Sequence, residues 1–151
     1  MRSFYARVVD WFERIPADLI AILARICLGT VFLRSGLLKL EGWQSGTTLS
    51  LFETEYPLPF LSPNAAMHLA TGAELFFPLL LSAGFLTRFA ALALLIMTLV
   101  IQIFVYPNAF DTHGTWAVCL LVLMKYGPGH LSLDYLLFGD RLGSSHTASR
   151  A

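Results

Sequence analysis

Four long apolar stretches dominate the chain, and short polar segments separate each from the next. The stretches cover about residues 18–40, 63–85, 87–106 and 112–126. A helix needs about 20 apolar residues to cross the hydrocarbon core of a bilayer. The pattern therefore predicts an all-α bundle of four membrane-spanning helices. The fourth span is short, and we expect local thinning of the bilayer or snorkelling of Lys125 to complete it.

Both flanks of this membrane domain, which we assign to residues 17–138, have a different pattern. In residues 1–16 apolar side chains recur at helical spacing opposite charged ones, which predicts a short amphipathic helix lying on the membrane surface. The apolar positions are Phe4, Val8, Trp11, Phe12 and Ile15. A second short helix is expected after the fourth span, through Leu137. Residues 139–151 then predict a flexible cytoplasmic tail.

Helix boundaries are marked by residues that start and stop helices. Pro16 and Asp18 are expected to open the first span, with Asp18 as a capping acid. The remaining signals are Ser62-Pro63-Asn64, Gly84, Pro107-Asn108 and Gly127-Pro128-Gly129.

Composition and charge agree with a membrane protein and argue against a soluble domain or a nucleic-acid-binding protein. Hydrophobic residues make up 56% of the chain and charged residues 13%, whereas soluble domains carry roughly 25% charged residues. Basic and acidic residues are balanced at ten each, so no net field recruits nucleic acid. Basic residues lie at both ends and between spans two and three, while the other two loops are acidic. This asymmetry predicts cytoplasmic N- and C-termini.

Ionisable side chains inside a span are costly and mark candidate sites. Counting along each span places six polar or aromatic residues near the outer half of the bundle. The predicted outward-facing pocket comprises Arg34, His68, Glu74, Gln102, His113 and Trp116. We expect Arg34 to pair with Glu74, because each would neutralise the other in lipid. Such a pair can serve a site or only fix the register of two helices.

Arg25 lies nine residues before Arg34, so the two point to opposite sides of a straight helix. If Arg34 faces the bundle, Arg25 either snorkels to the inner surface or meets a second subunit or a partner protein. Gly29 and Gly36, near the same side, would permit close backbone approach. These three residues are therefore the predicted partner or oligomer interface.

The two cysteines, Cys27 and Cys119, both fall at about mid-membrane depth. They could form a redox pair, but buried cysteines more often behave as inert apolar residues. No cluster has the spacing of a metal site.

Three elements of the sequence resemble the DoxX family of small inner-membrane proteins. The first is the run Ala24–Gly29 with Ser35–Leu40, which contains an arginine and a G-x-x-K element; the others are Glu74 with Leu80–Arg88 and the signature Gly127–Asp134. The resemblance covers about residues 19–137. It implies a bacterial inner-membrane protein of four helices.

The resemblance also implies a setting rather than a reaction. Family members are linked to redox systems: one branch resembles the membrane subunit of a thiosulfate:quinone oxidoreductase, and others accompany oxidative-stress or metal-stress proteins. Residues 106–116 resemble a subgroup found beside metallophore-maturation proteins. The leading hypothesis is an auxiliary membrane subunit of such a system, binding quinone in the pocket. The alternatives are a non-catalytic scaffold for a partner protein and a small oligomeric transporter; whether the chain is an enzyme stays open.

Overall fold

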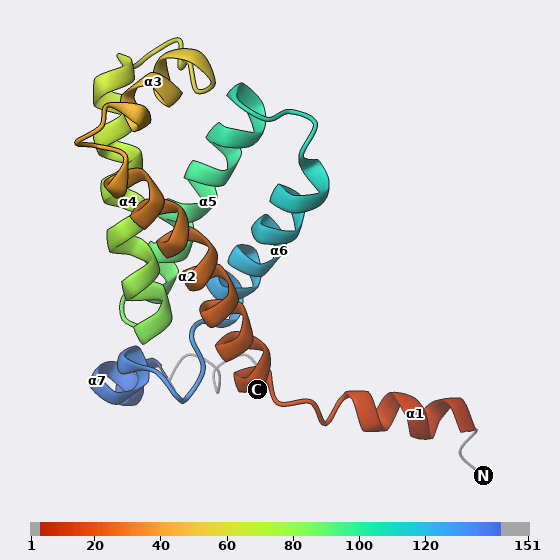
Figure 1. Cartoon of the computed structure of the whole chain (residues 1–151). Helices are drawn as coiled ribbons and strands as arrows, with labels where there is room; N and C mark the ends of the chain where they lie inside the picture. The colour runs from red at the N-terminus through yellow and green to blue at the C-terminus, as the bar shows by residue number, and fades with distance from the viewer. Residues whose placement is uncertain (1–3, 143–151) are drawn as a thin grey trace.

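A computed structural model describes residues 4–142, the last three by their backbone alone, and this part of the chain is helical with no strand. Seven helices follow one another within residues 4–142 (Figure 1). They are α1 (Phe4–Phe12), α2 (Ala17–Glu41), α3 (Thr47–Thr54), α4 (Pro63–Ala83), α5 (Thr87–Phe104), α6 (Phe110–Tyr126) and α7 (Leu133–Leu142).

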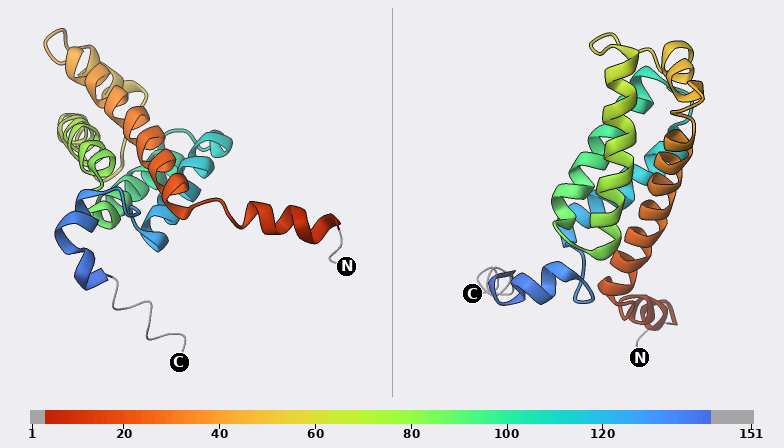
Figure 2. Two further views of the ribbon diagram at one scale, coloured as in Figure 1. Left: turned by 90° about the horizontal axis from the view of Figure 1, so that it is seen from below. Right: turned by 60° about the vertical axis from the view of Figure 1, so that its left-hand side comes forward.

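Four of these helices form a bundle in which each runs antiparallel to the one before it (Figure 1). Helix α2 packs on α4 and α6, and α5 packs on the same two helices, so the four close into a ring. Helix α3 lies across one end of the bundle, which we call the α3 end. Helices α1 and α7 lie at the opposite end, and α1 extends sideways from it (Figures 1 and 2).

The outer surface of the bundle identifies the protein as a membrane protein. Helices α2, α4 and α5 are each long and apolar enough to cross a bilayer. Large apolar side chains stay exposed along them, among them Ile26, Leu37, Phe76, Leu79, Ile96 and Ile103, and lipid is the solvent that such a surface needs. Helix α6 has 17 residues and is shorter than a typical span, as its sequence predicts.

The core of the bundle combines large aliphatic side chains with small residues that let helices approach closely. Leu81, Leu94 and Leu120 are fully buried. Gly36 of α2 faces α4, where an added Cβ would lie only 2.9–3.1 Å from atoms of Glu74. Gly29 likewise faces Ser82 of α4. Small residues at such positions are typical of membrane helix packing.

A set of contacts that we call the clasp ties the end of α6 to the rest of the α1/α7 end. Asp134 accepts hydrogen bonds from the backbone N–H groups of Leu86 (2.7 Å) and Thr87 (2.9 Å), and so caps α5. Its own N–H donates to the carbonyl of Gly84 (2.8 Å). Arg25 donates to the carbonyl of Leu131 (2.7 Å). The clasp therefore joins α2, the α4–α5 turn and the segment before α7.

Several local predictions need correction. Asp18 does not cap α2: its carboxylate accepts from the backbone N–H and pairs with the ring of His130, because the segment after α6 folds back to this point. Helix α7 continues past Leu137 to Leu142, so residues 139–142 of the expected tail are helical; residues 143–151, where the rest of that prediction falls, lie outside the described chain. Helix α3 was not predicted.

Candidate functional site

A buried ion pair lies between α2 and α4, in the half of the bundle nearer the α3 end. Lys39 Nζ lies 2.9 Å and 2.7 Å from the two carboxylate oxygens of Glu74 and donates a third hydrogen bond to Ser35 Oγ at 2.8 Å. The side chains are 11% and 3% exposed. A buried pair is tolerated when both members are hydrogen-bonded in this way, and all three ammonium donors of Lys39 are used.

The expected pair of Arg34 with Glu74 is wrong, because Lys39 takes that place. Arg34 is exposed. The predicted opposition of Arg25 and Arg34 on α2 holds, but the sides are reversed: Arg25 faces inward and Arg34 faces outward. Lys39 lies seven residues after the buried Phe32, which puts it on the inner face of the helix.

A pocket of about 350 Å³ lies beside the ion pair and is lined by residues of α2, α4, α5 and α6. Its walls are mainly apolar, and Lys39, Glu74 and Ser35 supply polar groups on one side. Side chains from α3 and the segment after it cover the α3 end of the pocket. These are Phe52, Tyr56, Leu58, Phe60 and Leu61. An apolar cavity of this size with a few polar groups is typical of a small-molecule site.

His113 and Trp116 of α6 line the pocket from another side. His113 is buried, and its Nδ1 lies 2.8 Å from Oε1 of Gln102. Gln102 donates its own amide N–H to the carbonyl of Pro107 at 2.7 Å, so its oxygen faces the histidine. This network assigns the proton of neutral His113 to Nδ1 and leaves Nε2 as an acceptor. Trp116 packs edge-to-face on Phe32 at 5.3 Å.

Two tyrosines border the pocket at the α3 end. The hydroxyl of Tyr106 lies 3.2 Å from Glu55 Oε2 and 3.3 Å from the hydroxyl of Tyr56. Burial raises the pKa of Tyr56 well above that of a free phenol, and the contact with Tyr106 acts in the same direction. Tyr56 is therefore neutral at every physiological pH.

The structure brings together four of the six predicted pocket residues. Glu74, His113 and Trp116 line the pocket, and Gln102 supports His113. His68 is exposed outside it, with its ring 4.8 Å from that of Trp43 and its Nδ1 against the carbonyl of Asn64. Arg34 also lies outside.

The predicted interface residues Arg25, Gly29 and Gly36 lie inside the chain. Arg25 belongs to the clasp, and the two glycines contact α4. These residues therefore do not form an outward face of α2. The cysteines are separate free thiols, Cys27 exposed and Cys119 half-buried.

Sequence reasoning missed the central residue, Lys39, because it lies at the end of the first apolar stretch, where a basic residue is expected at the membrane boundary. Its spacing of four residues from Ser35 and its place in the G-x-x-K element, Gly36 to Lys39, were the available signals. The tyrosine pair was missed because Tyr56 and Tyr106 come from two separate loops. Within residues 4–142, no three metal-ligating side chains gather into a cation site.

The fold and the pocket define a small helical membrane protein with a mainly apolar cavity inside its bundle. The chain belongs to the DoxX family, whose model matches residues 20–107, more than half of the chain. It is also similar to a protein of Haemophilus influenzae described as an uncharacterized protein. The two are 33% identical over 126 residues, which cover 77% of this chain and 82% of the relative. No solved structure matches the chain significantly.

Proposed function

We propose that the protein is an auxiliary membrane subunit of a redox or stress system and binds a lipid-soluble quinone in the pocket. The observation that carries this proposal is the Lys39–Glu74 pair in the wall of an apolar cavity of about 350 Å³. A quinone has an apolar ring with two oxygens that accept hydrogen bonds, and the pocket offers matching surfaces of both kinds.

Each polar group has a distinct part in this proposal. The Lys39 ammonium supplies the donor for a quinone oxygen, by exchanging its bond to Ser35 for one to the ligand. Glu74 keeps that ammonium charged and oriented. Nε2 of His113 accepts a hydrogen bond from the hydroxyl of a reduced quinol, since Gln102 holds its other nitrogen.

The proposal places the α1/α7 end in the cytoplasm of a bacterial inner membrane and the pocket in the outer half. Basic residues at the α1/α7 end support this orientation, because the loops at the α3 end contain acidic residues but no lysine or arginine. The basic residues are Arg7, Arg14, Arg88 and Lys125, and the acidic ones are Glu41, Glu53, Glu55 and Asp111.

Trp116 supplies a direct test of quinone binding, because it lines the pocket. In a W11F/W43F background it is the remaining tryptophan. Titration of this protein in nanodiscs with a decyl-tailed benzoquinone should quench its fluorescence in a saturable way. We expect the response to be lost in Lys39→Met and in the double variant K39M/E74L, which removes both charges together.

Arg34→Ala is the matched control for this experiment. It also removes one basic side chain from α2, but from the exposed face, so saturable quenching should persist. Absence of saturable quenching in the parent protein would end the quinone proposal, as would an undiminished response in the K39M/E74L variant.

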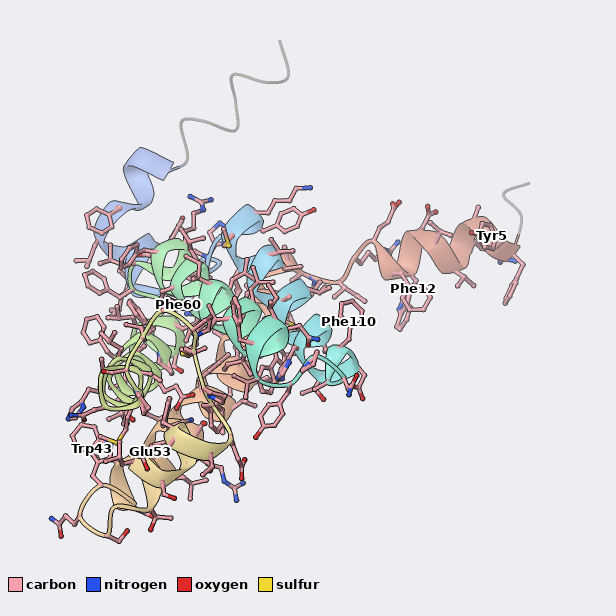
Figure 3. All side chains as sticks on the ribbon, turned by 90° about the horizontal axis from the view of Figure 1, so that it is seen from above. Tyr5, Phe12, Trp43, Glu53, Phe60 and Phe110 are labelled. Atoms are coloured by element: carbon pink, nitrogen blue, oxygen red, sulfur yellow. The ribbon has the colours of Figure 1, made fainter. Side chains whose placement is uncertain are left out.

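A scaffold that recruits a partner protein is the second candidate, and helix α1 supports it. No residue of α1 is buried, and the helix extends away from the bundle (Figure 2). Its exposed aromatic residues include Tyr5 and Phe12, which project from α1 in Figure 3. Affinity purification in mild detergent, with and without residues 1–15, tests this role: a partner must be lost with the helix.

A further inference from the structure

The pocket reaches the lipid-facing surface between α4 and α5. Leu69 of α4 and Ile96 of α5 both line the pocket, yet they are 61% and 55% exposed. The two helices meet at the α4–α5 turn and diverge toward the α3 end (Figure 1). The cavity is therefore bordered on this side by residues that also face the hydrocarbon of the bilayer.

Two aromatic contacts bound this opening, which we call the window. At its inner limit Phe77 of α4 packs against Phe89 of α5, with ring centroids 5.8 Å apart. At its outer limit Phe60 packs against Phe104 of α5 at 5.5 Å, and Phe60 lies over the bundle in the view onto the α3 end (Figure 3). From Phe89 to Phe104 the rise of α5 is about 22 Å.

The opposite side of the pocket is polar. Ser35, Lys39 and Tyr56 line the pocket and also a second hollow, a groove of about 700 Å³ beside α3. The groove is rich in hydroxyl groups, from Ser45, Thr47, Thr48, Ser50 and Thr54. The ion pair thus stands between a polar groove and an apolar cavity. The apolar tail of a ligand would be exposed to water in the groove, which costs hydrophobic free energy, whereas in the window it would stay in apolar surroundings.

We infer that the ligand is a single-tailed, lipid-soluble molecule that enters sideways from the bilayer through the window. Its polar head lies at Lys39 and Glu74, and its tail passes between Leu69 and Ile96 into the lipid. This inference rests on the proposed quinone function and adds to it the direction of access and the orientation of the ligand. The ring of the bound quinone lies in the outer half of the bundle, and the tail of the quinone stays in the hydrocarbon of the bilayer.

A photoreactive tail tests the orientation. The W11F/W43F protein in nanodiscs is exposed to a quinone with a diazirine at the end of a decyl tail, irradiated and mapped by mass spectrometry. We expect labelling of Leu69 and Ile96 that excess unlabelled quinone suppresses at least fivefold. Labelling of Leu99, which is lipid-exposed on α5 but outside the pocket, should not respond to the competitor.

Two neighbouring residues of α5 test the route. Val100 lines the pocket and Leu99 does not, so Val100→Phe should narrow the window and weaken quinone binding about tenfold, while Leu99→Phe should leave it unchanged. If the parent protein shows no quenching of Trp116, the proposed function itself fails. If quenching occurs but competed label falls on Val31 or Val118, or both phenylalanine variants bind equally, the function stands and the window is overturned.

Discussion

At the scale of single residues, the site depends on which of two basic side chains of α2 faces inward. Arg34 and Lys39 are five positions apart, or about 140° around a helix of 3.6 residues per turn. Lys39 reaches Glu74 across the gap that Gly36 leaves. Proline at position 78 has no N–H for the backbone carbonyl of Glu74. Glu74, Lys39 and Gly36 therefore depend on one another, because the glycine leaves the space in which the ion pair forms.

Removing one member of the ion pair should cost more than removing both. Glu74→Ala leaves the ammonium of Lys39 buried without its counter-charge, and loss of a partner from such a pair costs about 3–5 kcal/mol. The double variant K39M/E74L should recover most of that free energy of unfolding, measured by thermal unfolding in detergent. Equal destabilisation by the single and double variants would contradict a coupled pair.

Two glycines form a matched test of the close approach between α2 and α4. A Cβ at Gly36 would meet Glu74 at 2.9–3.1 Å, whereas one at Gly72 of α4 meets nothing within 4 Å. Gly36→Ala should destabilise the protein by about 1–3 kcal/mol through overpacking. Gly72→Ala should be neutral or stabilise it by up to about 1 kcal/mol. Unfolding in denaturing detergent measures both, and the reverse order would refute the close packing.

At the scale of elements, the limits of α4 follow from sequence, whereas the side of a helix that faces the bundle does not. Ser62, Pro63 and Gly84 mark the ends of α4 as predicted: Ser62 accepts from the N–H of Ala65, and Gly84 adopts a left-handed conformation. Helix α2, however, carries apolar side chains on all sides. Because the lipid and the core of the bundle are both apolar, both faces of a membrane helix are apolar. The sequence therefore predicts the angle between Arg25 and Arg34 but not which of them faces the bundle.

The short helix α3 escaped prediction for a different reason. Eight residues rich in threonine and serine show no clear helical periodicity, and α3 is held by tertiary contacts. Thr48 donates to the carbonyl of Lys39 at 2.6 Å, and Phe52 is buried with Ala66 and Met67 of α4. Contacts between distant segments also account for the tyrosine pair, and a single sequence does not reveal them.

The clasp predicts a specific effect of Asp134 on α5. Asp134→Ala removes the acceptor for the first N–H groups of that helix, and loss of such a cap costs about 0.5–2 kcal/mol. Amide hydrogen exchange at Leu86 and Thr87 should accelerate accordingly. Glu53→Ala removes an exposed carboxylate of α3 and serves as the control. Unchanged exchange at both amides in Asp134→Ala would show that the cap has no energetic role.

At the scale of the whole molecule, the two ends of the bundle differ in chemistry. The α3 end holds the pocket and the polar groove, and its two loops contain no lysine or arginine, while the α1/α7 end holds the clasp and the basic residues Arg7, Arg14, Arg88 and Lys125. The four helices of the ring, predicted from four apolar stretches, separate these two ends along the length of the bundle. The proposed orientation, with the pocket in the outer half of the membrane, follows from that distribution of charge.

Cysteine labelling tests the orientation directly. In a C27S/C119S background, a membrane-impermeant maleimide should modify Ser50→Cys in intact spheroplasts, since Ser50 is exposed at the α3 end. Leu136→Cys, exposed on α7, should react only after permeabilisation. The opposite labelling pattern would show that the protein has the inverse orientation in the membrane. Labelling of both positions in intact spheroplasts would rule out the antiparallel arrangement of spans across the bilayer.

The clasp also has a consequence for the order in which the protein is made. The carboxylate that caps α5 and the carbonyl that receives Arg25 both lie after α6, so the ribosome supplies them last. Until Asp134 has been translated, the turn between α4 and α5 lacks its side-chain acceptor. A nascent chain that ends after Tyr126 would contain all four helices of the bundle but would lack the Asp134 cap of α5 and the carbonyl that accepts from Arg25. We expect membrane proteases to degrade such a chain faster than the full protein.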